Sequence, residues 1–281
     1  MASSPTRYEP FGAKAADGVS LTGYVAGAPD GPAIVLLHPI GFDGRFWRAV
    51  VDRLQDRFRL IVPDARGHGG SGRGGETSIE QLAGDVEAIL DHLGVDRAAV
   101  AGCSMGSATS MHLGAAVPDR WTWLALANAP AKIPLPRERF EEVIAAARAG
   151  RFAEIARDML GRWVAPETRR LRPEWFTERL SDMLDTDAEG FADAFAALRD
   201  SDRRDDLGRI RAATLVITGD QDGGFSAADA ESMALAVPHG RSCTVSSAAH
   251  LVPLEQPEAF ASRLRDFDER VSELPIEKRP V

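Results

Sequence analysis

A serine flanked by glycines is the strongest chemical signal in this sequence. The segment Gly102-Cys103-Ser104-Met105-Gly106 has the spacing G-x-S-x-G and lies between an apolar run that ends at Ala101 and a helical pattern that begins at Met105. Glycines in such a strand-to-helix turn remove Cβ atoms, so the serine can adopt a strained backbone and expose its hydroxyl. The motif predicts Ser104 as a nucleophile. The alternative is a glycine-flanked turn without chemistry.

The base that a nucleophilic serine requires is predicted at His250. This histidine lies in the loop Ser247–Pro253, after a weak strand pattern and before a helix opened by Pro257. The loop position leaves the imidazole free to reach over a sheet. The other histidines have structural interpretations in helices or turns, and they are His38, His68, His92, His112 and His239.

The acid that would orient the imidazole is predicted at Asp222. It closes the segment Gly219-Asp220-Gln221-Asp222, which directly follows the apolar run Thr214–Thr218. Asp222 lies further out on this loop than the competing Asp220, whose side chain suits turn formation. An alternative acid position, at the end of the preceding strand, holds Asn128, whose amide cannot carry the charge that stabilises an imidazolium.

Acyl transfer also needs N–H donors for the negative oxygen that develops in the transition state. Met105, the residue after the nucleophile, supplies one by geometry. The second donor is predicted in the turn His38-Pro39-Ile40-Gly41, after the first central strand. Because Pro39 has no N–H, we expect Ile40 to be this donor. The alternative is an ordinary Pro-Gly loop.

Two further groups of residues have weaker functional interpretations. The segment Asp64–Ser71 is dense in glycine but lacks the spacing of a phosphate-binding loop, so we expect it to support the site. Four aromatic residues could either line a pocket or pack in the core. They are Trp47, Trp163, Trp175 and Phe176.

The elements that must position these residues are short apolar runs separated by helical patterns. Runs without alternation are typical of parallel strands buried on both faces. They cover residues 33–37, 60–62, 98–101, 124–127 and 214–217. The clearest helix between them has a possible capping box at Thr77 and Glu80 and a stop at Gly94. With an antiparallel hairpin around Asp17-Gly18 at the start, the predicted fold class is α/β, a mostly parallel central sheet flanked by helices.

The alternation of strands and helices stops between Pro130 and Asp206. Four helical patterns follow one another there, at about 137–148, 152–163, 174–184 and 188–199. Four helices between two buried strands cannot all cover a sheet face, so we expect a helical cap that forms a pocket over the strand ends. The predicted domains are a core of residues 1–130 and 206–271, a cap of residues 131–205 and a polar tail of residues 272–281.

Composition limits the partners and the compartment. The chain has 281 residues, with 33 Lys and Arg against 42 Asp and Glu, for a net charge of −9. This balance opposes binding to nucleic acid or to an anionic membrane. The two cysteines, Cys103 and Cys243, have no paired spacing, so neither a disulfide framework nor a cysteine metal site is predicted. Without an apolar leader or a membrane-length apolar run, we expect a cytoplasmic protein. The sequence has no cofactor-binding motif, so we also expect that it uses no metal and no cofactor.

These motifs together resemble the α/β-hydrolase superfamily over nearly the whole chain. The order Ser104, Asp222, His250 is the order of its triad. Within the superfamily the chain is similar to the 3-oxoadipate enol-lactonases of aromatic catabolism, through segments in and beside the cap: Leu126–Pro130, Gly161–Trp163 and Ala196–Asp202. The resemblance implies cofactor-free opening of a small lactone or ester. An anionic lactone would need positive charge in the pocket, for which Arg139, Arg162 and Arg199 are the candidates.

The match to enol-lactonases has three departures beside the expected site. Those enzymes usually have Asn-Ser-Leu-Gly in place of residues 38–41, a second glycine in place of Ser107, and a proline-containing turn in place of residues 223–225. The serine at position 104 separates the chain from haloalkane dehalogenases and epoxide hydrolases, which use aspartate there. General carboxylesterases, perhydrolases and C–C bond hydrolases are alternatives, as is a non-catalytic sensor of small molecules that retains the triad.

Overall fold

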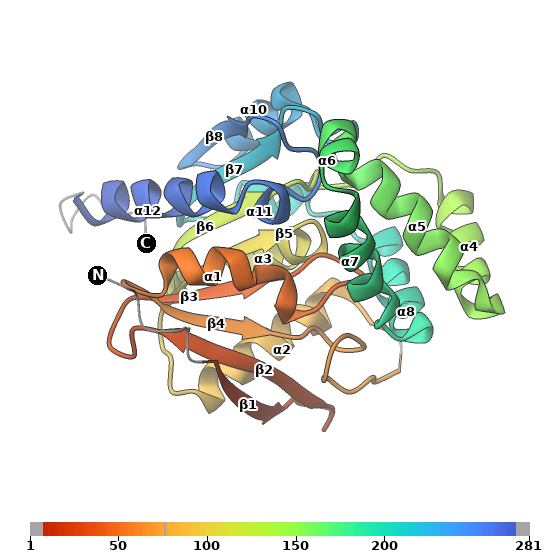
Figure 1. Cartoon of the computed structure of the whole chain (residues 1–281). Helices are drawn as coiled ribbons and strands as arrows, with labels where there is room; N and C mark the ends of the chain where they lie inside the picture. The colour runs from red at the N-terminus through yellow and green to blue at the C-terminus, as the bar shows by residue number, and fades with distance from the viewer. Residues whose placement is uncertain (1–7, 76, 274–281) are drawn as a thin grey trace.

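A single twisted sheet organises the chain in the computed structural model, which describes residues 8–75 and 77–273 (Figure 1). The strand order is β1-β2-β4-β3-β5-β6-β7-β8. The strands are β1 (Glu9–Lys14), β2 (Ser20–Gly27), β3 (Ala33–Leu37), β4 (Arg59–Pro63), β5 (Ala98–Cys103), β6 (Trp121–Ala127), β7 (Ala213–Gly219) and β8 (Gly240–Val245). From β4 to β8 all neighbours are parallel, and β1 and β2 form the antiparallel start. The predicted fold class is confirmed.

Helices cover both faces of the sheet, because its inner strands present apolar side chains on both sides. In β3, Ile34 and Leu36 belong to one core, whereas Val35 and Leu37 belong to the other. The first core is closed by α1 (Arg48–Leu54) and α12 (Pro257–Glu273), and the second by α2 (Ile79–His92), α3 (Met105–Ala116) and α10 (Ala227–Ala236). Helix α12 therefore includes the first two residues of the predicted tail, and residues 274–281 lie outside the described residues.

Helix α2 begins one residue later than predicted. Its N-cap is Ser78, whose hydroxyl accepts the Gln81 N–H, while the Gln81 side chain accepts the Ser78 N–H, both at 3.1 Å. Two capping-box patterns overlap in this segment, and the serine and glutamine are the pair that forms. The predicted stop is correct, since the chain turns at Gly94 with φ 64°.

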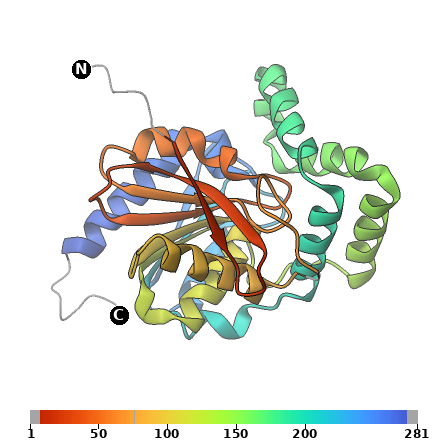
Figure 2. The same ribbon diagram turned by 90° about the horizontal axis from the view of Figure 1, so that it is seen from below.

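A group of helices between β6 and β7 stands to one side of the sheet (Figures 1 and 2). They are α4 (Arg137–Ala146), a π-helical segment (Ala147–Arg151), α5 (Phe152–Trp163), α6 (Pro166–Leu171), α7 (Pro173–Leu184) and α8 (Ala188–Asp200), followed by the short α9 (Arg204–Leu207). The sequence predicted helices at α4, α5, α7 and α8 but missed α6. At six residues, α6 is too short to show an apolar period.

The two ends of this inserted segment meet. The Arg203 N–H donates to the carbonyl oxygen of Ala131 at 2.7 Å, and the Lys132 ammonium lies 3.2 Å from a carboxylate oxygen of Asp202. The chain therefore leaves the sheet and returns to it at one place. Among the described residues, no helix has both the length and the apolar character needed to cross a membrane.

Candidate active site

Ser104 occupies a strained turn between β5 and α3. Its φ of 53° is rare for a residue with a Cβ atom. The turn is held by a hydrogen bond from the Ser104 N–H to the Ala127 carbonyl oxygen at 2.9 Å, so β6 fixes the position of the serine. Strain of this kind costs about 1–3 kcal/mol and persists only where the surroundings enforce it.

The glycines around Ser104 permit a close approach of backbone segments. A Cβ atom on Gly106 would lie 2.1 Å from the Leu37 carbonyl oxygen, and one on Gly102 would lie 2.3 Å from the carbonyl carbon of Gly106. Neither distance is sterically possible. The glycines therefore allow the start of α3 to pack against the ends of β3 and β5.

Asp222 and His250 are joined by a hydrogen bond of 3.0 Å between Oδ2 and Nδ1. The Asp222 side chain is only 3% exposed, and that of His250 is 15% exposed. Burial opposes the charged form of Asp222. Hydrogen bonds from His250, Asn128 and the Gly224 N–H outweigh this effect and hold the pKa of Asp222 below its ordinary value. With Nδ1 engaged, Nε2 is the nitrogen of His250 that can exchange a proton with a substrate or a serine.

Asn128 orients the Asp222 carboxylate. Its Nδ2 donates to Asp222 Oδ2 at 2.9 Å and to the Ala249 carbonyl oxygen at 3.1 Å. The side chain is fully buried, and φ is 53°, a conformation that asparagine tolerates better than most residues. Asn128, which occupies the alternative acid position, therefore holds the carboxylate of Asp222. Asp220 instead accepts the Ala248 N–H at 3.4 Å and is exposed, as a turn-forming residue would be.

Cys103, which directly precedes Ser104, contacts His250. The Cys103 thiol donates to the His250 carbonyl oxygen at 3.7 Å. The Ser104 hydroxyl has no hydrogen-bond partner among the described residues. Catalytic hydrogen bonds are commonly long in enzymes without substrate and shorten when substrate binds. The structure thus brings the loops of Ser104, Asp222 and His250 to one edge of the sheet.

The two predicted oxyanion donors lie on adjacent turns. Met105 is the first residue of α3, so its N–H takes no part in the intrahelical ladder. Ile40 follows β3, and its N–H has no acceptor among the described residues. The contact between Gly106 and Leu37 places the start of α3 beside the end of β3. The Met105 N–H is therefore adjacent to Ser104 in the chain, and the turn of Ile40 begins at the end of β3 that the start of α3 contacts.

Two neutral histidines support the turn that carries Ile40. His68 Nε2 accepts the Gly41 N–H at 3.2 Å, and His38 Nε2 accepts the Ala65 N–H at 2.9 Å. Because a backbone N–H can only donate, each Nε2 is unprotonated, and each Nδ1 carries the hydrogen, which faces a carbonyl oxygen. Burial lowers the pKa of His68 to about 3. The glycine-dense loop thus supports the site, as predicted.

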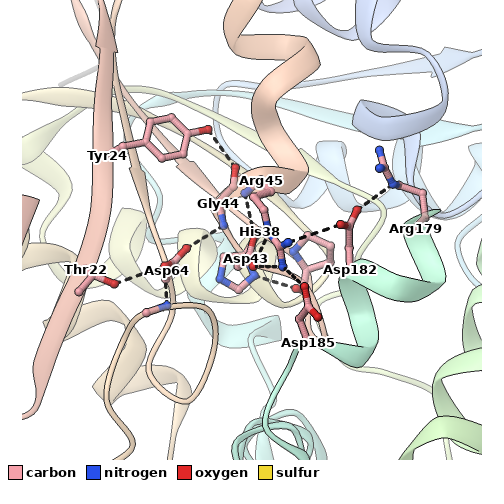
Figure 3. A network of polar contacts seen from close by, with 12 residues as sticks. Thr22, Tyr24, His38, Asp43, Gly44, Arg45, Asp64, Arg179, Asp182 and Asp185 are labelled. Carbon is pink, nitrogen blue, oxygen red and sulfur yellow. Dashed lines mark hydrogen bonds and ion pairs between the residues drawn. The ribbon is translucent and has the colours of Figure 1, made fainter. Parts of the chain in front are cut away.

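A polar network ties the same turn to α7 (Figure 3). Gly44 is held by Asp64 Oδ1, which accepts its N–H at 2.8 Å. Asp43 accepts the Arg45 N–H at 2.8 Å and also binds the Arg45 guanidinium, which lies 2.8 Å from Asp185 Oδ2 at the end of α7. Arg45 therefore links the segment after the oxyanion turn to the inserted helices.

Trp163 is the predicted aromatic contact that lies at the site. Its indole stacks on the His250 imidazole with ring centroids 5.5 Å apart and planes at 29°, and its carbonyl oxygen accepts the His250 N–H at 2.9 Å. Trp47 is instead fully buried in the core. Trp175 and Phe176 are half-buried in α7, where Trp175 lies under the Arg172 guanidinium.

The predicted arginine contacts are all engaged in ion pairs. Arg162 pairs with Asp158 at 2.7 Å, Arg199 with Glu141 at 2.6 Å, and Arg139 with Glu142. None of the three contacts Ser104, Asp222 or His250 in the described part of the chain. Within residues 8–75 and 77–273, no group of three or more His, Cys, Asp or Glu side chains is arranged to hold a metal ion.

Comparison with known proteins identifies the family of the chain. The alpha/beta hydrolase fold family matches residues 32–257, and the chain belongs to this family. The chain is 34% identical to 3-oxoadipate enol-lactonase 2 of Acinetobacter baylyi over 87% of this chain and 91% of that one. The enol-lactonase structure from Burkholderia xenovorans has a TM-score of 0.88 at 30% identity, covering 92% of this chain and 100% of the other. A thermophilic esterase from Thermogutta terrifontis has a TM-score of 0.87 at 28% identity, covering 94% and 98%.

These similarities confirm the resemblance seen in the motifs, both to the superfamily and to the enol-lactonases. The protein is a hydrolase of the α/β family.

Proposed function

We propose that the protein is a serine hydrolase that opens a small lactone or ester, with Ser104, Asp222 and His250 as its triad. The observation that carries this proposal is the 3.0 Å hydrogen bond between Asp222 and His250, beside the strained turn of Ser104. The N–H groups of Ile40 and Met105 form the oxyanion hole in this proposal. Residues 131–205 act as a cap over a core of residues 1–130 and 206–271.

The reaction would proceed in two acyl-transfer steps. His250 Nε2 takes the proton of Ser104, and the serine oxygen attacks the carbonyl carbon while the two N–H groups stabilise the oxyanion. His250 then protonates the departing oxygen, which in a lactone stays attached to the acyl group. Water activated by His250 releases the acid and restores Ser104. Asp222 holds the imidazole in the required tautomer and stabilises the imidazolium.

The enol-lactone of 3-oxoadipate is the substrate that the relatives support. It is favoured by the relatives named as enol-lactonases and by the cap segments in which this chain resembles such enzymes. A general carboxylesterase is the second candidate. It is favoured by the similarity to a thermophilic esterase and by the ion pairs of Arg139, Arg162 and Arg199, which leave these residues less free to bind an anionic lactone.

Replacement of the nucleophile tests the reaction class. Ser104→Ala should lower kcat for p-nitrophenyl acetate by a factor of about 10⁴ or more, because no group replaces the attacking oxygen. Asp222→Asn should also be severely impaired, whereas Asp220→Asn, a matched change two residues away, should stay close to the parent. Turnover of Ser104→Ala near the parent rate would refute the triad. If the parent protein itself reacts with only one equivalent of p-nitrophenyl acetate and does not turn over, it is a sensor and not an enzyme.

A comparison of kcat/KM between 3-oxoadipate enol-lactone and simple aryl esters tests the substrate. This ratio reports differential binding of the transition states. A preference for the lactone by orders of magnitude supports the lactonase, and the opposite preference supports the esterase. Peroxide-dependent oxidation in acetate buffer would identify a perhydrolase.

A further inference from the structure

Glu255 is a buried carboxylate that the proposed triad does not use. It ends the short helix α11 (Val252–Glu255), which follows the loop of His250, and it is 2% exposed. Its Oε2 accepts the Ala249 N–H at 2.8 Å, and its Oε1 accepts the Ala165 N–H at 2.9 Å. Burial raises the pKa of Glu255, while the two N–H groups, the Thr168 hydroxyl and the charge of Arg172 act in the opposite direction. A buried carboxylate is retained only where such partners compensate for lost hydration.

The two backbone segments that Glu255 joins are distant in sequence but adjacent at the site. Ala249 immediately precedes His250, and Ala165 follows Trp163 by two residues. His250 and Trp163 make their own contacts, through the His250 N–H to the Trp163 carbonyl oxygen at 2.9 Å and through the stacked rings. The loop of the base is therefore attached to the end of α5 at two consecutive residues.

A third contact anchors the same carboxylate residue. An Arg172 guanidinium nitrogen donates to the Glu255 carbonyl oxygen at 3.3 Å, from the junction between α6 and α7. Main-chain and side-chain atoms of Glu255 thus bind both ends of α6. Movement of this part of the inserted helices would be transmitted to Ala249 and His250.

We propose that Glu255 is a positioning residue for the base: it clamps the His250 loop to the α5–α6 junction, so that the imidazole stays against Trp163 and within reach of Ser104. This inference rests on the proposed function of His250. Orientation of the base then depends on the inserted helices as well as on Asp222. A displacement of about 1 Å in a reacting group can cost a factor of about 100 in rate, so a clamp of this kind has a measurable effect.

The variant Glu255→Gln tests the clamp with little change of shape. Glutamine keeps one oxygen acceptor but turns an NH₂ group toward the second backbone N–H, so one of the two bonds is lost. We expect kcat for p-nitrophenyl acetate to fall by a factor of about 10–100, with KM within about twofold of the parent, because the base and not the binding surface is displaced. The matched control is Asp268→Asn. Asp268 is also a buried carboxylate with two partners: it accepts the Trp123 Nε1–H at 2.9 Å, pairs with the Arg57 guanidinium at 2.8 Å and lies in α12, away from the site.

Both variants should lower the thermal midpoint, but only Glu255→Gln should lower kcat. If Glu255 only stabilises the fold, kcat should be equal in the two variants, and this result would overturn the proposal. A double-mutant cycle with Trp163→Leu gives a second readout. If Glu255 acts by holding His250 against Trp163, the double variant loses little more kcat than the more impaired single variant, whereas losses that simply add in free energy contradict the clamp.

The proposed function and the clamp fail in different ways. Turnover that survives Ser104→Ala overturns the proposed function. Turnover that disappears in Ser104→Ala but is retained in full in Glu255→Gln overturns the positioning role alone.

Discussion

Acid should destabilise this protein through His68. Burial lowers the pKa of His68 from 6.5 to about 3, although the Arg66 carbonyl oxygen and Asp43 act in the opposite direction. The unfolded chain would take up a proton on this imidazole below about pH 6.5, and the folded chain would not until about pH 3. The stability that the neutral ring contributes is therefore complete above pH 6.5 and is lost as the pH falls toward 3.

The size of this effect follows from the difference in pKa. Each pH unit between the two values is equivalent to about 1.4 kcal/mol, so lowering the pH to 5 should cost about 2 kcal/mol. The loss reaches about 4 kcal/mol at pH 3. Because His68 Nε2 accepts the Gly41 N–H, protonation would also remove the acceptor that holds the oxyanion turn.

Urea unfolding at pH 7.5 and pH 5 measures the contribution. The comparison variant is His68→Gln, whose side-chain oxygen can accept the same N–H without titrating. The parent should lose about 2 kcal/mol more than this variant between the two pH values, and His239→Gln, a change at an exposed turn, should behave as the parent does. Equal losses in the parent and in His68→Gln would show that burial does not keep His68 neutral.

Three further substitutions have defined outcomes. Gly106→Ala should cost about 3 kcal/mol or more in urea unfolding, because its Cβ atom would lie 2.1 Å from the Leu37 carbonyl oxygen in β3. Gly84→Ala is the control and should be neutral or stabilising, because no atom lies within 4 Å of its Cβ position. Equal unfolding midpoints in the two variants would contradict the steric explanation. Asn128→Ala should lower kcat for p-nitrophenyl acetate by a factor of about 10 or more, because Asp222 Oδ2 loses the donor that orients it, and a parent-like kcat would argue against this role of Asn128. Asp85→Asn should lower the free energy of unfolding by about 3 kcal/mol, because the buried Arg66 guanidinium would keep only the more exposed Asp17 as a charged partner, and a parent-like midpoint would refute the importance of the Asp85 pair.

The sheet and the strained turn of Ser104 could be predicted because local sequence determines them. Uninterrupted apolar runs indicate strands buried on both faces, and β3, β5, β6 and β7 lie where those runs occur. The glycines beside Ser104 mark a position where only a missing Cβ allows close packing. Asp222 and His250 were predicted from their places after strands, and the structure gives them a mutual hydrogen bond.

The residues that support the site could not be predicted, because their roles depend on contacts distant in sequence. Asn128 gains its role only when β6 and β7 are neighbours, so that its amide reaches Asp222. The role of Glu255 also depends on a contact distant in sequence, its hydrogen bond to the Ala165 N–H at the start of α6. The partners of Arg162 and Arg199 likewise depend on how the inserted helices present their carboxylates, which the positions of the arginines alone do not reveal.

The hydrogen bond between Arg203 and Ala131 has a consequence for how such a protein can diversify. Because the two ends of the insertion are already neighbours, evolution or a protein engineer can exchange residues 132–202 for another segment without separating the strands on either side. The replacement would leave the turn of Ser104 unchanged and would line the proposed substrate pocket with its own side chains. It would still have to offer a carbonyl oxygen to the His250 N–H, as Trp163 does, and this requirement limits which segments can be transplanted.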